Sequence, residues 1–169
     1  MGSRRAAESG AGGVGLLVSL LLHHPEIGTL RFDPRHQRLR FRFLVTRQVS
    51  DAEFTGLRRR LSDALEVYYR LVGQPAGVCR LTRHLYGEVT DLEISRDVAS
   101  LSAGEVGLII ALVQEACGDH LVTDAEGEAP PIEGRSELIG ELLAGLRQKP
   151  AASPLIALRE EGRVLVFHK

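Results

Sequence analysis

The chain is predicted to be an α+β protein, a mostly antiparallel sheet built from β-hairpins with helices packed on one face. Two observations carry this prediction. Segments in which apolar and polar residues alternate come in pairs joined by short turns, which is typical of antiparallel hairpins. The first two pairs are each followed by a Ser-x-x-Glu motif and by apolar residues at helical spacing. The expected order is α-ββ-α-ββ-α-α-ββ.

The length of 169 residues fits one domain, which we place at residues 13–169. Residues 1–12 are rich in Gly, Ala and Ser and are expected to form a disordered tail. The following segment, 14–24, is apolar nearly all round, which is typical of a helix that is buried or covered by a partner. It is too short to span a bilayer and lacks a small-residue cleavage site. We therefore expect a cytoplasmic protein without membrane attachment.

A first ββα unit is predicted over about residues 28–73. Its hairpin turns at residues 33–37, where Pro34 presets the backbone of a turn position. On the second arm apolar residues face one way and arginines the other, as in a sheet with one solvent-exposed face. Ser50 and Glu53 can cap each other's backbone, so a helix is expected over 51–72, ending at Gly73.

A second unit, about 78–118, repeats this plan. Strands are expected over 78–85 and 88–95, followed by a second Ser-x-x-Glu box at Ser102 and Glu105 and a helix that ends at Gly118. The likeness of the two units suggests a pseudo-twofold ββα repeat. An acidic, Pro-rich loop is expected over 123–131. The remainder, 132–169, is expected to form a helix over 132–149 and a hairpin with strands at 155–158 and 163–167.

The charge is unevenly distributed, although the net charge is only −1. Residues 1–85 carry 14 Arg and 7 acidic residues, whereas residues 86–169 carry 7 basic and 15 acidic residues. The two halves either neutralise each other within the fold or offer a basic face to an anionic partner. Arginine outnumbers lysine 19 to 2 and asparagine is absent, a composition typical of a thermophile or of a GC-rich genome. The arginine content alone is therefore weak evidence for nucleic-acid binding.

The most distinctive candidate site is a stripe of arginines on the solvent-exposed face of the first hairpin, with a second cluster on the helix that follows. Alternate strand residues lie roughly 6.6–7 Å apart, close to the spacing of successive phosphates along one nucleic-acid strand. Guanidinium groups also bind phosphate through paired hydrogen bonds. The alternative is internal pairing of the stripe with Asp91 and Glu93 of the second hairpin. The candidate anion-binding residues are Arg31, Arg35, Arg38, Arg40, Arg42, Arg58, Arg59 and Arg60.

Other chemistry finds little support in the sequence. There is no P-loop, GxGxxG, GxSxG or HExxH motif, and the histidines show no metal-ligand spacing beyond one adjacent pair. Cys79 and Cys117 form no CxxC motif and are expected to be buried free thiols. We therefore predict no metal, no cofactor and no catalytic residue.

One short segment resembles a known enzyme family. His23-His24-Pro25-Glu26, between a helix and a strand, is similar to the His-His-Pro-Glu segment of pterin carbinolamine dehydratases, in which paired imidazoles handle protons. The resemblance implies a small-molecule enzyme using His23 and His24. That family's third histidine would fall near Thr46 and Arg47, where no histidine stands. The alternative is that a histidine at the helix end interacts with the helix dipole.

The sequence thus favours a non-enzymatic binding or regulatory module that recognises an anionic partner through its Arg-rich hairpin. Nucleic acid or a ribonucleoprotein is the most concrete partner, and an acidic protein is the other anionic candidate. Two alternatives remain open at this point. One is a homo-oligomeric adaptor that uses the apolar first helix, with Leu17 and Leu20 at the contact. The other is the small-molecule enzyme with His23 and His24.

Overall fold

The computed structural model of the chain describes residues 2–75, 77, 79–124, 134–149 and 151–168, with side chains from residue 12 onward. The predicted fold class and element order are confirmed, with an additional 3-10 turn after the third helix. The elements are α1 (Gly2–His23), β1 (Thr29–Asp33), β2 (Arg38–Val45), α2 (Asp51–Val72), β3 (Cys79–Tyr86), β4 (Val89–Asp97), α3 (Ala103–Cys117), η1 (Gly118–His120), α4 (Arg135–Gln148), β5 (Leu155–Glu160) and β6 (Arg163–His168).

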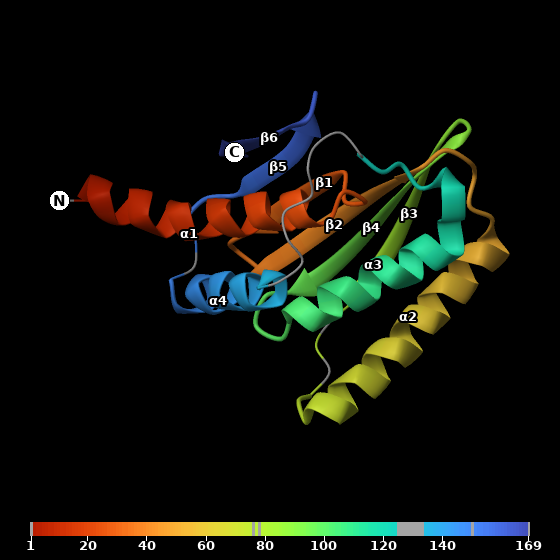
Figure 1. Cartoon of the computed structure of the whole chain (residues 1–169), viewed down its shortest axis with the longest axis horizontal. Helices are drawn as coiled ribbons and strands as arrows, with labels where there is room; N and C mark the ends of the chain where they lie inside the picture. The colour runs from red at the N-terminus through yellow and green to blue at the C-terminus, as the bar shows by residue number, and fades with distance from the viewer. Residues whose placement is uncertain (1, 76, 78, 125–133, 150, 169) are drawn as a thin grey trace.

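The strands form one antiparallel sheet in the order β3-β4-β2-β1-β5-β6. The first two hairpins meet where β2 pairs with β4, so they lie about a local twofold, as the predicted ββα repeat implies. The third hairpin extends the sheet beyond β1. Figure 1 shows α1 and α4 side by side over one half of the sheet, α3 below β3 and β4, and α2 beyond α3.

The core lies between the sheet and the helices. On β2 every second side chain from Leu39 to Val45 is buried, and the arginines between them face the opposite side. The helices contribute leucine, isoleucine and valine residues to the same core cluster. Among the described residues no helix covers the opposite face of the sheet, which we call the open face.

Three local differences from the predicted elements have physical reasons. The first helix begins at Gly2 rather than after a disordered tail, because residues 4–8 (Arg-Arg-Ala-Ala-Glu) are good helix formers. β4 continues to Asp97, two residues further than expected, because Arg96 finds a buried partner. The second capping box is only half formed: Ser102 accepts from the Glu105 N–H, but the Glu105 carboxylate turns inward to Arg96.

Other expectations are met closely. α2 has the predicted bounds, a complete capping box at Ser50 and Glu53, and a left-handed Gly73 at its end. The acidic loop predicted over 123–131 lies mostly outside the described residues. Within the described residues, no helix is long and apolar enough to cross a membrane.

Candidate anion-binding face

The predicted arginine stripe lies on the open face. Antiparallel pairing places Arg31 of β1 directly opposite Arg40 of β2, with Arg38 and Arg42 two residues to either side on the same face. Their neighbours Leu39 and Phe41 point into the core, which fixes the direction of the arginines through the two-residue period of a strand. The stripe is therefore not covered by any described helix.

One row of directly paired residues crosses all six strands of this face, and we call it the transverse row. Its members in order from β3 to β6 are Arg80, Ser95, Arg40, Arg31, Ile156 and Phe167. Three guanidinium groups thus share one line with a phenylalanine ring that is 50% exposed. Neighbouring strands lie about 4.8 Å apart, so the two central arginines stand side by side.

The pairing of Arg31 with Arg40 is electrostatically unfavourable, because like charges directly opposite each other destabilise a sheet. Arg31 makes no ion pair with a described residue, and its Nε atom is buried without a hydrogen-bond partner among them. A hollow of about 240 Å³ opens beside these two arginines, bordered also by Asp33, Pro154 and Ile156. Two guanidinium groups thus border the hollow, and that of Arg31 has no ion pair with a described residue.

Internal pairing, the alternative weighed from the sequence, accounts for part of the stripe. Arg42 pairs with the buried carboxylate of Asp91 and lies 4.0 Å from Glu93. Arg40 is 3.9 Å from Glu93, at the limit of an ion pair. Among the described residues no ion pair involves Arg31, Arg38 or Arg80. Arg42 is thus paired with carboxylates of the protein itself, whereas Arg31 and Arg80 of the transverse row have no ion pair with a described residue.

The turn of the first hairpin is organised by Asp33. This carboxylate accepts hydrogen bonds from the backbone of Arg35 and His36 and from the His36 ring at 2.7 Å. The His36 ring, more than the other contacts, lowers the pKa of Asp33 below its usual value. The Arg35 side chain is exposed at the tip, so it extends the basic surface of the stripe.

The second predicted cluster does not join the stripe. Arg58, Arg59 and Arg60 lie on α2, which is on the helix side of the sheet. Arg60 pairs with Glu115 of α3 at 2.5 Å, and Arg58 lies over the Phe54 ring at 5.6 Å. Only Arg58 approaches the sheet, at the rim of a groove beside β3.

Arg80 is the member of the face that the sequence analysis missed. Its position follows from the pairing of β3 with β4 and of β4 with β2, which brings Arg80 and Arg40 to either side of Ser95. The signal was the alternation of Arg80, Thr82 and His84 along β3. That alternation shows which side chains share a face, but only the long-range register shows which strand they face.

The paired histidines have a structural setting. The His23 ring is buried and its Nδ1 atom lies 2.7 Å from the Ser19 carbonyl oxygen in the same helix. His24 is half-buried, and burial together with Arg135, His23 and Arg159 lowers its pKa to about 4. Arg159 donates to the carbonyl oxygens of Leu21 and His24 and so satisfies the end of α1. Both histidines are thus held at the end of α1 by contacts within the fold.

The adaptor alternative placed Leu17 and Leu20 of the apolar first helix at a contact with another chain, but both side chains are buried within the fold. Leu16, Leu17, Leu20 and Leu21 are at most 1% exposed, because α1 packs against the sheet and against α4 of its own chain. The helix is apolar on most sides because it is covered on most sides within the fold.

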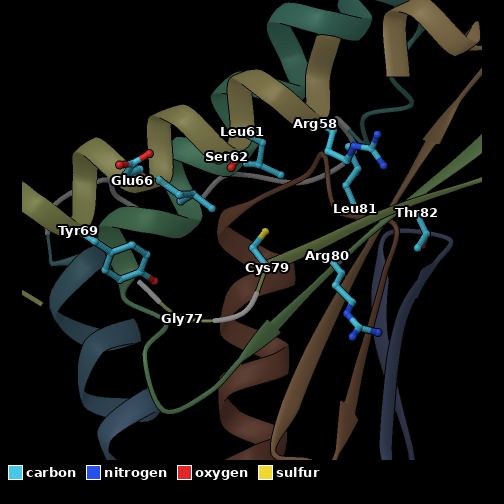
Figure 2. Close-up of a pocket in the computed structure, with 11 residues that line it drawn as sticks. Arg58, Leu61, Ser62, Glu66, Tyr69, Gly77, Cys79, Arg80, Leu81 and Thr82 are labelled. Atoms are coloured by element: carbon cyan, nitrogen blue, oxygen red, sulfur yellow. The ribbon is translucent and has the colours of Figure 1, made fainter. Parts of the chain in front are cut away.

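A second feature is a groove of about 730 Å³ between α2 and β3. Figure 2 shows the Cys79 side chain directed toward α2 and the Arg80 side chain directed away from it. Burial raises the pKa of the Cys79 thiol to about 11, so this cysteine is a poor nucleophile at neutral pH. Cys117 is also a free thiol, as expected, and is buried. Within the described residues, no three metal-ligating side chains gather.

Comparison of the chain with protein-family models, with curated proteins and with solved structures found no match.

Proposed function

We propose that the protein is a non-enzymatic binding module that recognises nucleic acid through the open face of its sheet. The observation that carries the proposal is the transverse row, in which three arginines and an exposed aromatic ring stand in one line across the sheet. Guanidinium groups bind phosphate oxygens, and an exposed ring offers a surface for base stacking. An anion would also relieve the repulsion between Arg31 and Arg40.

Single-stranded RNA suits this face better than an acidic protein does. The apolar end of the row, Ile156 and Phe167, has no charge to pair with a carboxylate, whereas a base can lie against it. A flexible strand can also place a phosphate beside each guanidinium in turn.

Fluorescence anisotropy with a labelled oligouridylate tests the proposal. The row variant Arg31→Gln/Arg40→Gln/Arg80→Gln removes three charges from the open face. The control Arg59→Gln/Arg60→Gln/Arg70→Gln removes three from exposed positions of α2, so both proteins carry the same net charge. The row variant is expected to lose most of the affinity. Its plot of log affinity against log salt should flatten by about 2, given roughly 0.7 per neutralised phosphate on a single strand.

The aromatic ring gives a second readout. Phe167→Leu keeps an apolar side chain and leaves the charges intact, yet it removes a stacking surface worth about 1–3 kcal/mol per base. We expect binding to weaken about fivefold or more at unchanged salt dependence. The proposal is overturned if the wild-type protein does not bind the oligonucleotide, or if the row and control variants lose affinity equally.

A further inference from the structure

β3 is an edge strand with an unpaired side. It is eight residues long, and among the described residues only β4 pairs with it. The β3–β4 hairpin has a two-residue turn at Gly87 and Glu88, and Gly87 has a φ of 59°. In such a hairpin the flanking pair, Tyr86 and Val89, exchanges both backbone hydrogen bonds.

The alternation of an antiparallel ladder then determines which backbone groups point outward. Tyr86, His84, Thr82 and Arg80 direct their N–H and C=O groups to β4. Leu85, Arg83 and Leu81 direct theirs away from the sheet. A row of donors and acceptors therefore stands ready to pair with a further strand.

The groove between α2 and β3 lies beside this edge. Its lining includes Leu61 and Leu65 of α2 and Leu81 of β3, together with the polar Ser62 and Glu66, and it is open to solvent. A strand added to β3 would direct every second side chain toward this wall, on the side of the sheet where Leu81 lies. Apolar side chains at those positions would cover the leucines.

The other side chains of an added strand would lie on the open face, next to Arg80, Thr82 and His84. Arg80 is exposed and makes no ion pair with a described residue. Acidic side chains would therefore be favoured there, since opposite charges on neighbouring strands stabilise a sheet.

We propose that β3 and the groove beside it bind an extended segment of another protein, in which acidic residues alternate with apolar ones. The segment adds to the sheet as a seventh strand, with its acidic side chains beside Arg80 and its apolar side chains against α2.

A second copy of the chain does not fit this description. In the part of the chain that the structure describes, the sheet ends at β3, with the sequence CRLTRHLY, and at β6, with the sequence RVLVFH. Neither contains an acidic residue, so pairing between copies would bring arginines and histidines together. The charge of the edge thus disfavours self-pairing and favours an acidic partner.

Fluorescence anisotropy with a labelled peptide of alternating valine and glutamate, as long as β3, tests the chemistry. The control peptide has the same composition with the valines and glutamates in separate blocks. We expect the alternating peptide to bind and the block peptide to bind at least tenfold more weakly. Equal affinity for the two peptides, or no binding of either, overturns the proposal.

A charge reversal tests the place of binding. Arg80→Glu should weaken binding of the valine–glutamate peptide by about tenfold and strengthen binding of a valine–lysine peptide. Arg59→Glu makes the same change at an exposed position of α2 outside the groove and should alter neither affinity. If both variants behave alike, the peptide is responding to net charge and the site is wrong.

Amide hydrogen exchange followed by NMR reads the backbone pairing directly. The peptide should protect the outward amides of Leu81, Arg83 and Leu85, whereas the amides of Thr82 and His84 should change little. Protection of these amides on raising the protein concentration alone would identify a second copy as the occupant and overturn the proposal. This protection would not be produced by RNA, because RNA bound on the open face leaves the outward amides exposed.

Discussion

Removing the charge of Glu105 should destabilise the protein more than any surface substitution. Arg96 and Glu105 have no exposed side-chain area, and they form two hydrogen bonds of 2.9 and 2.7 Å. The Tyr69 hydroxyl contacts both side chains. This buried cluster joins α2, α3 and β4, so it also holds the α2 wall of the groove in place.

The substitution Glu105→Gln keeps the shape of the side chain but leaves the Arg96 guanidinium without its main counter-charge. Breaking a buried ion pair in this way costs about 3–5 kcal/mol. Domains of this size have a total unfolding free energy of roughly 5–15 kcal/mol. Asp97 remains beside Arg96 at 2.6 Å, which places the expected loss near the lower end, about 3 kcal/mol.

Replacing both partners should cost less than replacing one. Arg96→Met with Glu105→Leu removes the two buried charges together, and such apolar replacements of a buried pair are often neutral. Urea unfolding followed by circular dichroism measures the three variants, with the slope m as a check that the unfolded states are comparable. A loss below about 1 kcal/mol for Glu105→Gln, or a double variant no more stable than the single one, would refute the reasoning.

Three further predictions follow from local environments. The pKa of His24 is lowered from 6.5 to about 4 in the folded state, so protonation of this ring favours unfolding. The urea midpoint should therefore fall as the pH drops from 6.5 toward 4. The variant His24→Gln should show a smaller fall. Since the pKa of Cys79 is raised to about 11, a disulfide reagent at pH 8 should modify it about 100-fold more slowly in the native than in the unfolded protein; equal rates would contradict its burial. Ser50→Ala removes the acceptor for the Glu53 N–H and should cost about 1 kcal/mol in urea unfolding, whereas no loss would show that the cap is dispensable.

Local patterns predicted most of the fold because they act over a few residues. The capping box at Ser50 and the left-handed Gly73 define α2 at both ends, and the alternation from Arg38 to Val45 shows which side chains of β2 face the core. The first helix could not be placed as well, since its glycines and serines favour a tail while its arginines, alanines and glutamate favour a helix.

Long-range register accounts for what was missed. Ser102-Ala103-Gly104-Glu105 has the pattern of a capping box, but a buried Arg96 competes for the same carboxylate and the buried pair prevails. Arg80 belongs to the open face only because β3, β4 and β2 pair in a particular register. Neither fact is encoded within a window of a few residues.

The two proposed ligands share Arg80, and they should therefore oppose each other. Carboxylates of a strand added to β3 would stand about 4.8 Å from this guanidinium and compete with phosphate at the end of the transverse row. One unfavourable contact between a carboxylate and a phosphate, both exposed to solvent, costs about 1 kcal/mol, or about fivefold in affinity. Saturating valine–glutamate peptide should weaken oligouridylate binding by that factor, and by reciprocity oligouridylate should weaken peptide binding equally. In Arg80→Gln each ligand alone should bind more weakly, because each has lost the same counter-charge. If the two ligands bind independently in the wild-type protein, the edge of β3 and the open face do not meet at Arg80.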